Sequence, residues 1–77
     1  MNTQEEDGRK MSAPTINAYA AIRQTDNREW IDINTLEVLP ELARNAADTT
    51  NKLIPLYAQQ NPVIRIAKIE IREKETP

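Results

Sequence analysis

The sequence contains no cysteine and no histidine, and its only glycine is Gly8. The lack of cysteine and histidine excludes a disulfide framework, a thiolate zinc site and an imidazole general base. A single glycine excludes glycine-rich phosphate loops and dinucleotide-binding fingerprints, because their tight turns need several glycines. Most of the common catalytic and cofactor-binding motifs are therefore absent, and we expect the protein to use no cofactor.

Length and composition indicate one small domain. A chain of 77 residues buries only about 60% of the surface that it exposes when unfolded. With one tryptophan and two tyrosines, its core must be small. No apolar run approaches the ~20 residues of a membrane span, and the polar start of the chain does not resemble a signal peptide. We therefore expect a soluble protein of the cytoplasm.

Acidic and basic residues are evenly mixed along the chain. The net charge is −2, and between Thr15 and Arg72 the two signs are equal in number. Proteins that bind duplex nucleic acid normally carry a basic stripe, because the neutralisation of phosphates supplies most of their non-specific affinity. The even distribution of charge argues against nucleic acid as a partner.

Both ends of the chain are polar. Residues 1–14 and 73–77 carry too few apolar side chains to offset the entropy that a segment loses when it becomes ordered. We expect flexible tails on either side of a single domain that is formed by residues 15–72.

Two segments near the start of this domain show the two-residue period of strands. Apolar residues alternate along the chain over 16–23 and again over 29–34. The connection, 24–28, contains Asp26 and Asn27, residue types that tolerate the left-handed conformations of hairpin turns. We expect a β-hairpin whose register pairs Arg23 with Arg28, Ala21 with Trp30, Ala20 with Ile31 and Ala18 with Ile33.

The spacing of apolar residues becomes helical after Thr35. Pro40 fits the first turn of a helix, where its missing N–H would have no partner in any case. Pro55 ends or kinks the helix before a short turn over 56–60. The residues that we expect on the buried side of the helix are Leu42, Ala43, Ala46, Ala47, Thr50, Leu53 and Ile54.

A third strand is predicted over 63–72, where β-branched residues are frequent. Ile64 and Ile66 stand at even positions, whereas Ala67, Ile69 and Ile71 stand at odd positions, so the alternation of apolar residues slips by one after Ile66. A β-bulge near Ala67 would place both apolar sets on one face, and without it each half of the strand faces a different side. The sequence leaves both arrangements open.

These elements predict an α+β fold of two layers, in which a hairpin, a helix and a third antiparallel strand (ββαβ) place one helix on a three-stranded sheet. The strand orders 3-1-2 and 1-2-3 both satisfy the pattern. We expect the helix to cover the face that carries Ile16, Ile22, Ile31 and Ile33, and the other face to stay open.

The face left open is where the sequence indicates a binding surface. The hairpin residues expected there are Tyr19, Ala21, Arg23, Trp30, Asp32 and Asn34. Aromatic and arginine side chains of this kind are enriched in binding hot spots. The alternative is a structural role, in which Trp30 packs over Ala21 and against the stem of Arg23 or Arg65.

Arg23, Asp32 and Arg65 also have two interpretations. They form either a recognition cluster for a carboxylate or phosphate or, as is more common, a cross-strand charge pair. The candidate partner-binding residues are then Tyr19, Arg23, Trp30, Asp32, Asn34 and Arg65. We expect no enzyme and no metal site, because the acidic residues are scattered and no glycine turn arranges oxygen ligands.

The third strand raises the question of self-association. At an edge of the sheet, its free backbone groups would invite pairing with another chain. Its charged residues would act as gatekeepers against that pairing. The small core favours a homodimer, because association adds apolar burial that one copy lacks. The sequence leaves the oligomeric state open.

Three segments, Ala21-Ile22-Arg23, Trp30 to Thr35 and Val63 to Ile71, together have the layout AIR…WIDINT…VIRIAKIEI. This layout resembles that of small uncharacterised accessory proteins encoded by temperate phages and prophages of enteric bacteria. The resemblance covers the chain from Ala18 to Ile71. It implies an accessory phage protein that is dispensable for particle assembly, and it supplies no catalytic residue.

Two hypotheses for the function follow. The favoured one is a small non-enzymatic interaction protein that binds a host or phage protein through the open sheet face or a strand edge. The alternative is a single-stranded nucleic-acid binding module, in which bases stack on Tyr19 and Trp30 beside Arg23 and Arg65.

Overall fold

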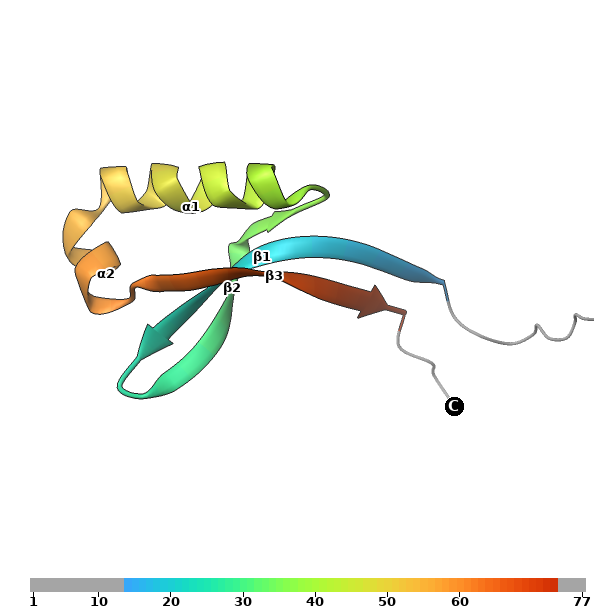
Figure 1. The fold of residues 1–77 in the computed structure, drawn as a ribbon, viewed down its shortest axis with the longest axis horizontal. Helices are drawn as coiled ribbons and strands as arrows, with labels where there is room; N and C mark the ends of the chain where they lie inside the picture. The colour runs from blue at the N-terminus through green and yellow to red at the C-terminus, as the bar shows by residue number, and fades with distance from the viewer. Residues whose placement is uncertain (1–13, 74–77) are drawn as a thin grey trace, which may run out of the picture.

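The computed structural model describes residues 14–73 and confirms the predicted ββαβ fold. Its elements are β1 (Thr15–Thr25), β2 (Arg28–Glu37), α1 (Pro40–Leu53), α2 (Pro55–Gln60) and β3 (Val63–Arg72). The strands form one antiparallel sheet in the order β2-β1-β3, which is one of the two predicted orders. Figure 1 shows α1 lying along one side of this sheet. Apart from Pro14 and Glu73, the predicted flexible tails lie outside the described residues.

The hairpin turn is tighter than predicted. β1 and β2 are joined by only Asp26 and Asn27, whose φ angles of 51° and 67° are both left-handed. Such a two-residue turn matches the twist of the strands and tolerates Asp and Asn. Thr25 therefore pairs with Arg28, and the predicted pairing of Arg23 with Arg28 is wrong by two residues. Because side chains alternate with a period of two, the error leaves the residues from Arg28 to Asp32 on their predicted side of the strand. The predicted pairing of Ala18 with Ile33 does not form, because a bulge in β2 follows Asp32.

A bulge in β2 interrupts the hairpin beyond Asp32. Ala21 pairs with Asp32, whereas Tyr19 pairs with Glu37, so β2 has several extra residues at this point. The buried Thr35 hydroxyl occupies the gap: it accepts a hydrogen bond from the Ala21 N–H (2.7 Å) and donates one to the Asp32 carbonyl (2.6 Å). The bulge bends β2 away from the sheet toward the start of α1 (Figure 1).

The register of β3 shifts opposite Ile22 and Arg23, at Ile64, and not near Ala67. From Arg65 onward the pairing with β1 is regular. Ile66 therefore shares a side with Ala21, and the isoleucines after Ala67 lie on the opposite side. Of the two predicted arrangements, the one in which the halves of the strand face different sides is the one that forms.

Helix α1 packs on the sheet through its alanines. Pro40 is at its start, Glu41 lies in its first turn and Lys52 in its last, as the helix dipole favours. Ala43 and Ala47 are buried, and their short side chains let the helix backbone approach the sheet closely. The prediction that longer residues share this buried side is wrong for three of them, which are exposed: Leu42, Leu53 and Ile54.

The core is small and consists mostly of alanine. The buried apolar residues are Ala18, Ala20, Ala21, Ile22, Ala43 and Ala47. Ile16, Ile31 and Ile33, which we expected beneath the helix, are 61%, 45% and 74% exposed. The covered side of the sheet is therefore the one with Ala21 and Arg23, so the predicted assignment of the two faces is inverted. Within residues 14–73, neither helix has the length and apolar character that a membrane-spanning helix needs.

Candidate functional site

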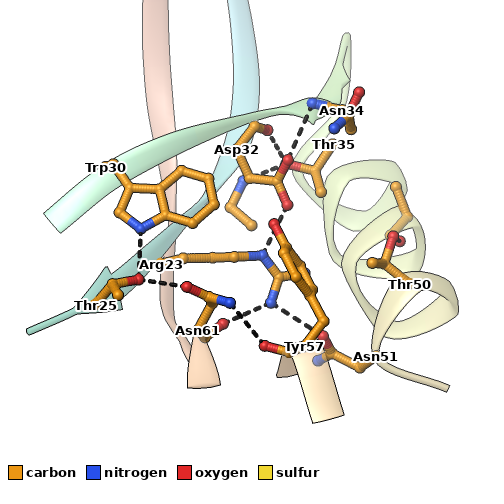
Figure 2. Close-up of polar contacts among 12 residues, drawn as sticks. Arg23, Thr25, Trp30, Asp32, Asn34, Thr35, Thr50, Asn51, Tyr57 and Asn61 are labelled. Atoms are coloured by element: carbon orange, nitrogen blue, oxygen red, sulfur yellow. Dashed lines mark hydrogen bonds and ion pairs between the residues drawn. The ribbon is translucent and has the colours of Figure 1, made fainter. Parts of the chain in front are cut away.

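The covered side of the sheet holds a closed polar cluster, the Arg23 cluster, formed by Arg23, Asp32, Asn51, Tyr57 and Asn61 (Figure 2). Arg23 Nε donates a hydrogen bond to Asp32 Oδ2 at 2.7 Å. Its Nη1 donates to Asn51 Oδ1 at 3.1 Å and to the Asn61 carbonyl at 2.7 Å. The guanidinium carbon lies 5.1 Å from the centre of the Tyr57 ring. One side chain thus connects the two hairpin strands, both helices and the residues that lead into β3.

The ion pair at the centre of the Arg23 cluster is sealed from solvent, whereas Asn51, Tyr57 and Asn61 around it are half-buried. The side chains of Arg23 and Asp32 are 0% and 3% exposed. Arg23 Nη2 is buried without a hydrogen-bond partner among the described residues, and the Tyr57 ring beside the guanidinium offers its negative face in compensation. A buried charge is tolerated only when it is paired and hydrogen-bonded, as it is here. The geometry therefore supports a structural role for Arg23, because a ligand cannot reach it.

Trp30 lies directly opposite Arg23 on the neighbouring strand. Its indole N–H donates to Thr25 Oγ1 at 2.9 Å, and the Thr25 hydroxyl donates in turn to Asn61 Oδ1. Asn61 Nδ2 donates to the Tyr57 carbonyl at 2.9 Å. This chain of hydrogen bonds joins the hairpin to the end of α2 (Figure 2). Trp30 is half-buried, and these hydrogen bonds tie its indole to Thr25 and, through Thr25, to Asn61.

The six candidate partner-binding residues do not share one surface. Arg23 and Asp32 are buried, so the prediction that they lie on the open face is wrong. Tyr19 and Trp30 are half-buried on the covered side of the strands, and Asn34 is exposed in the β2 bulge. Arg65 is exposed on the opposite side of the sheet, where it pairs with Ile22.

Sequence reasoning missed four residues that hold Arg23 and the bulge: Thr35, Asn51, Tyr57 and Asn61. None of them belongs to the strand pattern that placed Arg23. The one available signal was that Arg23 and Asp32 share a side of the hairpin, which indicated a charge pair without revealing its burial. Within residues 14–73, no group of three acidic side chains lies close enough together to hold a metal ion.

The side of the sheet away from α1, here called the open face, is apolar. Strand pairing places opposite one another Ile16 and Ile71, Ala18 and Ile69, Ala20 and Ala67, and Ile22 and Ile31. Ala18, Ala20 and Ile22 are buried and Ala67 is half-buried, whereas Ile16, Ile31 and Ile71 are 61%, 45% and 40% exposed. The open face thus presents branched apolar side chains to solvent.

An ion pair crosses the open face. Arg65 Nη2 on β3 donates to Glu29 Oε1 on β2 at 2.8 Å, so the pair spans the central strand. The hydrogen bond and the charge of Arg65 lower the pKa of Glu29 below its ordinary value. Beside the pair lies a groove of about 280 Å³, lined by Ile22, Glu29, Trp30, Ile31 and Arg65. Apolar surface and polar hydrogen-bonding groups therefore meet at one place, which we take as the candidate site.

Comparisons with protein-family models, with curated proteins and with solved structures found no match to this chain. The candidate site is therefore interpreted from its own geometry.

Proposed function

We propose that the protein is a small non-enzymatic interaction protein that binds a protein partner through its open face. The observation that carries the proposal is the exposure of Ile16, Ile31 and Ile71 on a sheet face that neither helix covers. Ile16 and Ile71 lie opposite each other at one end of this face, and Ile31 lies beside the groove near the other end. Patches of exposed apolar side chains on a small domain are typical of interaction sites.

The groove gives the open face a basis for specificity. Ile22 is 5% exposed and forms part of the groove lining, and Ile31 stands beside it. Arg65 and Glu29 are each about half exposed, so they can exchange their mutual contact for contacts with a partner. A partner that suits this site brings an apolar side chain into the groove and a carboxylate or carbonyl oxygen toward Arg65.

The resemblance of the strand segments to accessory phage proteins suggests where such a partner comes from. We propose a host or phage protein in the bacterial cytoplasm. This origin is a separate part of the proposal, since binding through the open face does not depend on it.

The nucleic-acid alternative has less support from the geometry. It requires bases to stack on Tyr19 and Trp30 with arginines beside them. Arg23 is buried, and Arg65 lies on the other side of the sheet. These four residues therefore do not form one exposed stacking surface, although Trp30 and Arg65 both line the groove.

The experiment compares proteins retained by immobilised variants from a host lysate. Ile31→Asp places a charge on the open face, and Leu53→Asp is the matched control on α1, where the leucine is also exposed. We expect Ile31→Asp to lose the proteins that the wild type retains specifically, because a buried carboxylate at the contact is costly. Leu53→Asp should retain them. Circular dichroism must show that both variants are folded.

The opposite result would contradict the proposal. If Leu53→Asp loses the retained proteins and folded Ile31→Asp keeps them, the partner binds the helices and the open face is not the site.

A further inference from the structure

Part of the sheet extends beyond the helix as a two-stranded arm. β1 pairs with β3 over Thr15–Arg23, but its pairing with β2 begins only at Tyr19. The first residues of β1 and the last residues of β3, here called the arm, therefore have only each other as neighbours. Figure 1 shows the arm projecting past the start of α1. An isolated two-stranded ribbon is only marginally stable in water, so pairing with a further strand would stabilise the arm.

Among residues 14–73, no strand pairs with the outer edge of β3. β3 is the last strand of the order β2-β1-β3, and its pairing partner β1 lies on one side only. The charges on this edge decide what can pair with it. Gatekeeper residues prevent pairing when a strand meets its own copy with like charges opposed. Here the charges have both signs, so the outcome depends on the register.

We propose that the outer edge of β3 pairs with the same edge of a second copy of this chain, antiparallel and about a two-fold axis at Ile69. Opposed residues in an antiparallel pair lie on the same side of the sheet, so a symmetric pair must be centred on one residue. With Ile69 at the centre, Lys68 lies opposite Glu70 of the second copy. Arg65 lies opposite Glu73 of the second copy.

The neighbouring registers are unfavourable. A pair centred on Lys68 opposes the two lysines, and one centred on Glu70 opposes the two glutamates and sets Lys68 against Arg72. A pair centred on Ala67 places both Lys68 and Glu70 opposite isoleucines, so it forms no charge pair. The centre at Ile69 instead makes two Lys68–Glu70 pairs and keeps Ile69 against Ile69 on the open face. A pair centred on Ile71 also opposes unlike charges, Glu70 and Arg72, but only residues 70–72 of each β3 then overlap. Of the registers that oppose unlike charges, the one centred on Ile69 therefore overlaps the longer part of the strand.

The pairing would join two sheets into one of six strands. Because the two-fold axis is perpendicular to the sheet, both open faces lie on one side of the joined sheet. The inference does not depend on the proposed function, and the two can be separated: Lys68 and Glu70 lie on the side of β3 away from the open face.

The experiment uses charge reversal and analytical ultracentrifugation of the full chain. We expect the wild type to dimerise, and Lys68→Glu and Glu70→Lys each to raise the dimer dissociation constant by about tenfold or more, because each change opposes like charges twice per dimer. An equimolar mixture of the two variants should form a heterodimer of wild-type affinity, since every opposed pair is then complementary. Lys52→Glu on α1 is the control and should leave the dimer unchanged.

A cysteine at the centre of the pair tests the register directly. The chain has no cysteine of its own, so Ile69→Cys can be oxidised without competing disulfides. Opposed residues in an antiparallel pair have Cα atoms about 4.5–5.5 Å apart, within the range that a disulfide spans. We expect Ile69→Cys to give a cross-linked dimer and Leu53→Cys to give none.

Three results would overturn the inference. The first is a wild type that stays monomeric at millimolar concentration. The second is a dimer whose affinity neither charge reversal changes, as expected for association through the free edge of β1. The third is a mixture of the two variants that fails to restore the affinity.

Discussion

Arg23 of β1 reaches diagonally across the hairpin to Asp32 of β2, and the two form a 2.7 Å ion pair with both side chains enclosed. The remaining contacts of the Arg23 guanidinium hold α1 and the end of α2 against the sheet. In a domain whose core is mostly alanine, this polar cluster replaces part of the apolar packing that a larger core would supply. The covered side of the sheet therefore serves stability, and the open face remains free for the proposed binding.

Arg23→Ala should lower the free energy of unfolding by about 3–5 kcal/mol, because it leaves the Asp32 carboxylate buried without its partner. Small domains have only about 5–15 kcal/mol in total, so the variant should be partly unfolded at 37 °C. Urea titration followed by circular dichroism measures the change. Arg28→Ala, an exposed arginine beside the turn, is the control and should change the value by less than about 0.5 kcal/mol.

A double variant distinguishes the effect of the two charges on stability from the effect of side-chain packing. Arg23→Met with Asp32→Leu removes both charges and keeps apolar volume, so it should be clearly more stable than Arg23→Ala. If Arg23→Ala is as stable as the wild type, the ion pair is not the element that holds the helices on the sheet.

Thr35→Val should lower the free energy of unfolding by about 1–3 kcal/mol. The substitution keeps the shape of the side chain but leaves the buried Ala21 N–H without its acceptor. The matched control is Thr49→Val on α1, whose hydroxyl donates to the Asn45 carbonyl at an exposed position. The control should change stability by only a few tenths of a kcal/mol. Equal effects of the two substitutions would show that Thr35 does not maintain the bulge.

The Glu29–Arg65 pair predicts a specific dependence on pH. The pKa of Glu29 is below its ordinary value of 4.5, first through the hydrogen bond from Arg65 and then through the charge of Arg65. A carboxylate whose pKa is lowered by folding stabilises the fold above pH 4.5, and this contribution is lost as the pH falls through the lowered pKa. The effect should be small and should shrink in salt, because both groups are exposed.

A carbon-detected NMR titration of the Glu29 carboxyl group measures this pKa. We expect a midpoint below 4.5 in the wild type and a return toward that value in Arg65→Gln. A midpoint that Arg65→Gln leaves unchanged would show that the ion pair across the open face does not persist in solution.

The order of the elements could be predicted because each one has a local signature. The two-residue period, the prolines at the helix ends and the Asp-Asn turn each depend on neighbouring residues only. The register error came from the same turn: Asp26 and Asn27 both adopt left-handed φ angles, which lets two residues close the hairpin without a glycine.

The two faces of the sheet could not be assigned from the strands alone. An arginine and an aspartate on one side of a hairpin normally indicate the solvent side. Here the partners that make their burial tolerable, Asn51, Tyr57 and Asn61, come from segments far along the chain. The same packing of the helices against the Arg23 side leaves the apolar side of the sheet uncovered. The open face could therefore be recognised only from the assembled fold.

The most direct test of the account is NMR mapping of a partner on the labelled protein. Once the lysate experiment has identified a protein that the wild type retains, its addition should shift the methyl signals of Ile16, Ile31 and Ile71. The methyl signals of Leu53 and Leu56, which lie on the helices and are more exposed than the three isoleucines, should stay in place. Shifts confined to the helix leucines, with the three isoleucines unaffected, would contradict the assignment of the open face as the binding surface.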